Sequence, residues 1–158
     1  MTQKLWGGRF KKKTDPQFDE FSSSFRWDWR LLPYDLQIDR AHVKALKKCK
    51  VLTKSESAKL LSAISKIEKR FTDPSRILSK VHEDIHSALQ EELASLAGAL
   101  ADKVHTARSR NDLVSQSTRL YCRDHALKIL SMIGALQGQL VQKAEETRHI
   151  LVPGMTHL

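Results

Sequence analysis

The sequence predicts an all-α protein, in which a small helical N-terminal domain with an extended arm precedes the first long helix of a central helical bundle. Three observations support this prediction. Apolar residues recur at helical spacing after Pro33, glycine is sparse beyond that point, and residues 111–150 contain no proline. We expect an arm over residues 1–33, the small domain over residues 34–110 and the start of the bundle over residues 111–158.

The predicted arm differs in composition from the rest of the chain. Eight of the ten aromatic residues fall within residues 1–34, at spacings that fit neither a helix nor a strand for long, and a proline and a run of serines interrupt the segment. We expect an extended conformation, packed on its own subunit or on a neighbouring one.

Three helices are expected in the small domain. The first runs from Tyr34 to about Lys50, and the second begins at Thr53, which has the spacing of a capping box with Glu56. The third runs from about residue 83 to 97 and stops at Gly98. The side chains expected to face inward are Tyr34, Ile38, Ala41, Ala45 and Cys49 in the first helix, Leu60, Ile64, Ile67 and Phe71 in the second, and Ile85, Leu89, Leu93 and Leu96 in the third.

A single long helix is expected from residue 111 to about 150, with Asn111 or Asp112 as its N-cap. At 1.5 Å per residue it would be a rod of roughly 55–60 Å. That is longer than a compact domain of this size needs, and Gly134 and Gly138 would permit close approach of another helix. The rod is therefore predicted to belong to a bundle that other helices or other chains complete.

Composition narrows the class of function. The 158 residues include 27 Lys and Arg against 18 Asp and Glu, for a formal charge of +9. The densest basic stretches, Lys11–Lys13 and Lys47–Lys48, have no interleaved aromatic residues for base stacking, so a solvated surface is favoured over nucleic-acid binding. Two cysteines, the lack of a membrane-length apolar run and the lack of a signal-peptide pattern favour a cytoplasmic protein.

Residues His82–His86 match H-E-x-x-H, the helical pattern in which two histidines bind zinc and the glutamate acts as a base. A zinc metallopeptidase is therefore one hypothesis. Asp84 inside the motif, and the lack of a well-placed third ligand in the following residues, weaken it.

Residues 105–112 read H-T-A-R-S-R-N-D and place Arg108, Ser109, Arg110 and Asn111 at the start of the long helix. Free backbone amides and the positive end of the helix dipole favour anions there, and arginine recognises carboxylates with two parallel hydrogen bonds. The pattern predicts a site for a carboxylate or a phosphate. A capped helix start with exposed arginines is the alternative.

With these segments in order, the chain resembles the argininosuccinate lyase family of the fumarase/aspartase superfamily. The resemblance includes L-W-G-G-R-F at residues 5–10, E-D-I-H at 83–86, the whole of 105–112 and P-G-M-T-H-L at 153–158. It implies an enzyme that splits argininosuccinate reversibly into arginine and fumarate, the last step of arginine biosynthesis, as a homotetramer and without a cofactor or metal. The H-E-x-x-H match would then be accidental.

The resemblance also implies roles for individual residues. His157 and His86 would lie at the reacting centre, with His157 as the acid/base group. The residues that would bind substrate are Ser24, Asp28, Arg108, Ser109, Arg110, Asn111 and Thr156. Leu113 stands where the family usually has glutamine.

The resemblance predicts that the 158-residue chain is a fragment, because the family's further central helices and the loop that carries its serine base have no counterpart here. We expect the isolated chain to be inactive. A non-catalytic product of a disrupted lyase gene, or a recruited structural protein, is the alternative hypothesis.

Overall fold

The computed structural model describes residues 14–71 and 82–156, and every regular element within these ranges is a helix. The chain divides into two compact units, residues 1–118 and 119–158. The first contains α1 (Pro16–Ser22), α2 (Phe25–Asp28), the 3-10 helix η1 (Trp29–Leu31), α3 (Leu32–Lys48), α4 (Lys54–Arg70), α6 (Ile85–Ala97) and the 3-10 helix η2 (Gly98–His105). Helix α7 (Arg110–Thr147) starts in the first unit and supplies the second. The predicted all-α class is confirmed.

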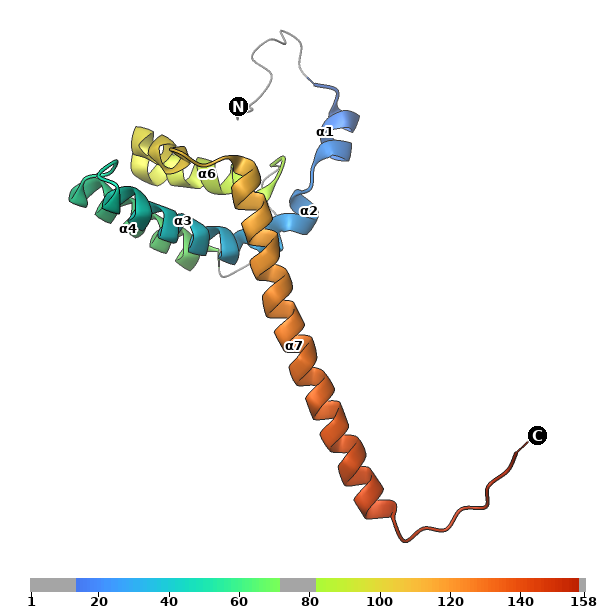
Figure 1. The fold of residues 1–158 in the computed structure, drawn as a ribbon. Helices are drawn as coiled ribbons and strands as arrows, with labels where there is room; N and C mark the ends of the chain where they lie inside the picture. Colours follow the sequence, from blue (N-terminus) through green and yellow to red (C-terminus); the bar gives the residue numbers. More distant parts are fainter. Residues whose placement is uncertain (1–13, 72–81, 157–158) are drawn as a thin grey trace. The chain divides into compact units, whose positions relative to one another are not determined.

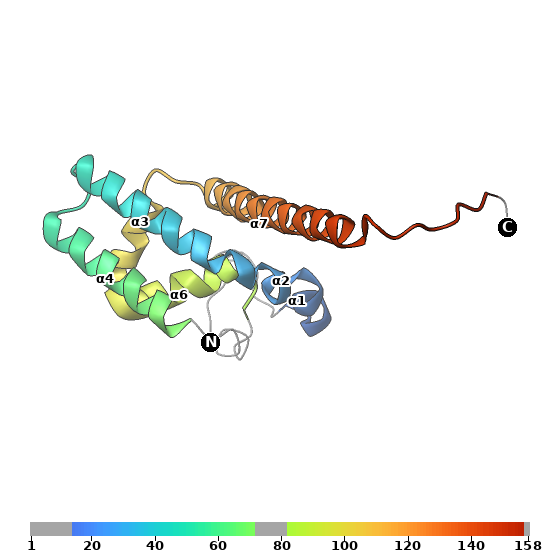
Figure 2. The same cartoon turned by 90° about the horizontal axis from the view of Figure 1, so that it is seen from below.

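The first unit is built on α3, α4 and α6, which pack against one another (Figures 1 and 2). Their apolar faces enclose one core. Its buried members are Phe25, Leu32, Leu36, Val43, Leu46, Leu52, Leu60, Ala63, Ile64, Ile67, Ile85, Ala88, Leu89, Leu93, Ala97, Ala101 and Val104.

Local signals explain where these helices begin and end. The capping box predicted for α4 is present, because the Thr53 hydroxyl accepts from the Glu56 amide at 3.2 Å and the Glu56 carboxylate accepts from the Thr53 amide at 2.8 Å. Helix α3 ends where Lys50 adopts a φ of 61° and the Val51 amide donates to the Leu46 carbonyl at 2.9 Å. Gly98 ends α6 with a φ of 66°, as predicted.

The arm differs from the extended conformation that we expected. Residues 16–31 form α1, α2 and η1. The cause is local at α1, where Asp15 caps the helix through the Gln17 amide at 2.8 Å and Pro16 occupies the first helical position. Residues 1–13, with the L-W-G-G-R-F segment, lie outside the described residues.

The buried face of α3 also differs from the expected one. Tyr34 and Ile38 are half-buried, but Ala41, Ala45 and Cys49 are exposed. The buried positions are Leu32, Asp35, Leu36, Asp39, Val43 and Leu46. Two aspartates thus occupy the stripe that packs inward, and each pairs with a side chain from a distant segment, His86 for Asp35 and Arg108 for Asp39. The inward positions predicted for α4 and α6 are buried or half-buried, as expected.

The N-cap of α7 lies two or three residues before the predicted one, Asn111 or Asp112. Ser109 caps the helix, because its hydroxyl accepts from the Asn111 amide at 3.2 Å while the Asp112 carboxylate accepts from the Ser109 amide at 2.9 Å. In the second unit the apolar side chains of α7 from Leu127 onward are exposed. Among the described residues no helix has the length and apolar character to cross a membrane.

Candidate active site

The short helix α2 is held against the segment that precedes α6. The Ser24 amide donates to the Glu83 carbonyl at 3.0 Å, and the Ser24 hydroxyl donates to the Asp28 carboxylate at 2.6 Å. The other oxygen of Asp28 accepts from the Ile85 amide at 3.1 Å. Burial raises the pKa of Asp28, although these hydrogen bonds oppose it. Two residues predicted to bind substrate therefore lie beside His86.

The His86 side chain is, with that of Arg108, the most enclosed among the described candidates. It is 7% exposed, and its Nδ1 lies 2.5 Å from an oxygen of Asp35, whose side chain is fully buried. Burial acts to lower the pKa of His86, but the hydrogen bond to Asp35 and the charges of Asp35, Asp84 and Asp28 outweigh it, so the pKa lies above 6.5. This histidine favours the imidazolium form more than a free histidine does.

The segment 105–112 leads into α7 through a left-handed residue, Ala107, with a φ of 57°. Its two arginines both contact carboxylates of this chain. Arg108 pairs with Asp39 at 2.7 Å, with side chains 7% and 5% exposed. Arg110 pairs with Asp84 and also donates to the Ser87 hydroxyl at 3.1 Å.

The structure brings five of the predicted residues into one region. Asp84 joins the two halves, since it caps α6 through the Ser87 amide at 2.7 Å and also pairs with Arg110. Asn111 is exposed on the first turn of α7, and Ser109, a further predicted residue that is exposed directly before Arg110, caps this helix. The region formed by Ser24, Asp28, His86, Arg110 and Asn111 combines a hydroxyl, a carboxylate, a titratable ring, a guanidinium and an amide, which can bind a polyanionic substrate and move a proton.

Three predicted residues are not part of this region as the structure describes it. The Arg108 guanidinium is taken up by Asp39 in the interior. Thr156 is exposed and belongs to the second unit. His157 lies outside the described residues.

Asp35 and Asp39 were missed as functional candidates by sequence reasoning. The available signal was their spacing of four on a helix among inward-facing positions, since an unpaired carboxylate is rarely buried. The partners lie 51 and 69 positions away along the chain, which local patterns do not reveal.

The zinc-peptidase geometry is not present. His82 precedes α6 and pairs with Glu91 at 3.6 Å, whereas His86 lies on α6 and pairs with Asp35. The two histidines therefore do not share one helical face as that motif requires. Within residues 14–71 and 82–156 there is no group of three or more His, Cys, Asp or Glu side chains that could hold a metal ion.

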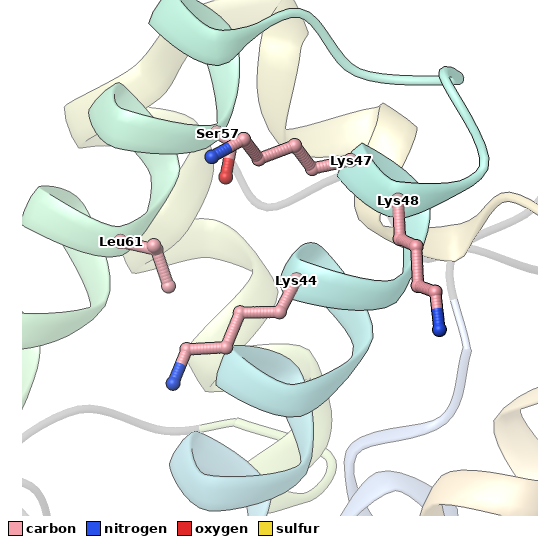
Figure 3. Close-up of a pocket in the computed structure, with 5 residues that line it drawn as sticks. All are labelled: Lys44, Lys47, Lys48, Ser57 and Leu61. Carbon is pink, nitrogen blue, oxygen red and sulfur yellow. The ribbon is translucent and has the colours of Figure 1, made fainter.

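An open pocket of about 400 Å³ lies elsewhere in the first unit, between α3 and α4. Figure 3 shows its lining residues Lys44, Lys47, Lys48, Ser57 and Leu61. The three lysines are exposed and extend from α3 in different directions. This arrangement agrees with the solvated basic surface expected for Lys47–Lys48.

Comparison with known proteins places this sequence among lyases. The family described as "Lyase" matches residues 8–158. Similar curated relatives are the argininosuccinate lyases of Hydrogenobaculum sp. (strain Y04AAS1), 41% identical over 155 residues, and of Syntrophobacter fumaroxidans, 37% identical over 158 residues. A third, from Bacillus subtilis (strain 168), is 37% identical over 156 residues. These matches cover 98%, 100% and 99% of the chain but 34% of each relative, so the chain spans about a third of their length.

Proposed function

The chain belongs to the lyase family, and we propose that it forms part of an argininosuccinate lyase, which splits argininosuccinate reversibly into L-arginine and fumarate in arginine biosynthesis. The observation that carries this proposal is 36–41% identity to argininosuccinate lyases over 98–100% of the chain. The arrangement of hydroxyl, guanidinium and amide groups at the start of α7 supports it, because the substrate is a polycarboxylate.

The proposed reaction is a β-elimination. The bond between the guanidino nitrogen and the succinyl carbon breaks, a proton leaves the adjacent carbon, its electron pair forms the double bond of fumarate, and the nitrogen gains a proton. Negative charge builds on the neighbouring carboxylate as the proton leaves. Groups that favour this charge, namely Arg110, Asn111 and the positive end of α7, would lower the barrier.

In this proposal Ser24, Asp28, Ser109, Arg110, Asn111 and Thr156 bind substrate. His86 and His157 act at the reacting centre, with His157 moving the proton or supporting its transfer. Arg108, whose side chain is 7% exposed and paired with Asp39, would act by holding the loop in place. The division into segments 1–33, 34–110 and 111–158, a homotetrameric assembly and a cytoplasmic location are also proposed. No cofactor is invoked.

A chimera tests the proposal. This chain replaces the matching segment of the Bacillus subtilis relative, and fumarate formation from argininosuccinate is followed by its ultraviolet absorbance. We expect turnover by the chimera, loss of most activity in its His157→Asn variant, retention in Glu68→Gln as the exposed control, and no turnover by the 158 residues alone.

Two results would contradict the proposal. A chimera that assembles like the intact relative but forms no fumarate would favour the non-catalytic alternative. Robust turnover by the isolated chain would refute the need for the segments that it lacks relative to the curated enzymes.

A further inference from the structure

Helix α3 carries two aspartates in its buried stripe, one helical turn apart. Asp35 is 0% exposed and Asp39 is 3% exposed. Burying a carboxylate costs free energy unless a partner of opposite charge or hydrogen-bond donors compensate for it. Each aspartate therefore needs an explanation, and the two have different partners: Arg108 for Asp39 and His86 for Asp35.

The Asp35 contact fixes one nitrogen of the imidazole. A carboxylate can only accept a hydrogen bond, so the 2.5 Å contact to Asp35 requires that His86 Nδ1 carries the proton and donates it. Nε2 is left as the ring nitrogen that can exchange a proton with another molecule. The second oxygen of Asp35 has no hydrogen-bond partner among the described residues, so the carboxylate is incompletely compensated.

This pair is a poor choice for packing alone. An apolar residue at position 35 would extend the stripe of Leu32, Leu36 and Val43 without an orphaned oxygen. A buried carboxylate at position 35 is explained if the His86 ring must be held in one orientation and one tautomer beside Ser24 and Asp28.

We propose that Asp35 is the positioning residue for His86, holding the ring through Nδ1 so that Nε2 serves the substrate; the catalytic part of this inference rests on the proposed function. The other charged groups around the ring are Asp28 on α2 and Asp84 before α6. Asp84 pairs with Arg110 of α7. Asp35 is the carboxylate that contacts the His86 ring directly.

The first test uses the chain itself and does not depend on activity. Nitrogen chemical shifts of His86, followed across a pH titration by NMR, report the tautomer and the ring pKa. In the wild type we expect the neutral ring to carry its proton on Nδ1 and the pKa to lie above 6.5. A neutral ring protonated on Nε2 in the wild type would overturn the proposal without any variant.

The Asp35→Asn variant removes the charge and keeps the shape. We expect the pKa of His86 to fall, since burial then acts against less compensation. Asp39→Asn is the matched control, because that residue is equally buried one turn along α3 and pairs with Arg108 instead. Equal effects of the two variants on His86, or no effect of Asp35→Asn in a folded chain, would refute the assignment.

The second test uses the active chimera. We expect Asp35→Asn to lower kcat by about 10–100-fold with little change in KM, as is typical when the group that orients a functional histidine is removed. A change confined to KM, or no change, would overturn the positioning role. If the unaltered chimera is inactive, the proposed function fails, while the NMR result still decides whether Asp35 sets the state of His86.

Discussion

The Asp39–Arg108 pair allows the sharpest prediction. It joins α3 to the loop before α7, and both side chains are less than a tenth exposed. Burial raises the pKa of Asp39 even though Arg108 acts to lower it. Desolvation of the carboxylate therefore outweighs the attraction of the guanidinium, which is the situation in which replacing both partners by apolar residues costs little.

We expect Asp39→Asn and Arg108→Met each to lower the free energy of unfolding by about 3–5 kcal/mol, because each leaves a buried group without its partner. The total free energy of unfolding of a domain is about 5–15 kcal/mol. With a urea slope of about 2 kcal/mol/M, the midpoint would fall by about 2 M. The double variant Asp39→Leu/Arg108→Met should regain most of this loss. Urea unfolding followed by circular dichroism measures all three.

The two single variants should differ in their response to pH. With Arg108 removed, Asp39 has a raised pKa and can be neutralised by a proton, so the native state binds more protons than the unfolded one and stability rises as pH falls toward 3.8. With Asp39 removed, the loss should persist over the same pH range, because a guanidinium group is not neutralised by a change of pH in proteins.

The exposed pair Arg40–Glu68, which also joins α3 to another segment, is the control. Its side chains are 30% and 54% exposed, so Glu68→Gln should cost no more than about 1 kcal/mol. If Asp39→Asn costs no more than Glu68→Gln, or if the double variant is as unstable as the sum of the single ones, the reasoning from burial fails.

Three further predictions concern the ends of helices and the surface. Thr53→Ala should lower the free energy of unfolding by about 1 kcal/mol, because α4 loses its cap, and urea unfolding measures this loss against Ser22→Ala, which removes no cap. Gly98→Ala should lower the free energy of unfolding by about 1–3 kcal/mol, because a φ of 66° with a ψ of −147° suits glycine alone. Gly134→Ala within α7, where the added Cβ meets open space, should cost nothing and serves as the control. Equal melting temperatures of the two variants would refute this prediction. The hydrogen bond from Lys103, with those from Thr53, holds the pKa of Glu56 at about 2. The stabilising contribution of the Glu56 carboxylate should therefore be present above pH 4.5 and vanish as the pH falls through about 2. The difference in melting temperature between the wild type and Glu56→Gln should close over that range.

Local signals were sufficient for much of the fold. The Thr53 capping box, the Gly98 stop and the apolar stripes of α4 and α6 all depend on residues within a turn or two, and each was predicted correctly. The Asp15–Pro16 signal for α1 was also present in the sequence, but the irregular aromatic spacing obscured it. The same holds for the start of α7, where the Ser109 hydroxyl accepts from the Asn111 amide and the Asp112 carboxylate accepts from the Ser109 amide.

What could not be predicted depends on distant partners. A pattern of apolar residues identified the inward face of α3 only in part, because Asp35 and Asp39 count as polar until His86 and Arg108 are known to meet them. The resemblance predicts functional roles for His86 and the segment 105–112. It did not reveal that Arg108 and Arg110 each contact a carboxylate of this chain.

Helix α3 limits how the site can move. Asp35 holds His86, Asp39 holds Arg108, and His42 Nε2 contacts the Thr106 carbonyl at 3.0 Å. Turning the helix by a single residue, about 100°, or sliding it by one turn, about 5.4 Å, would break all three contacts together. The segments 82–86 and 105–112 are therefore both anchored to the same helix. A substrate that displaces one of these two segments must therefore either bend that segment relative to α3, or move α3 and the other segment with it.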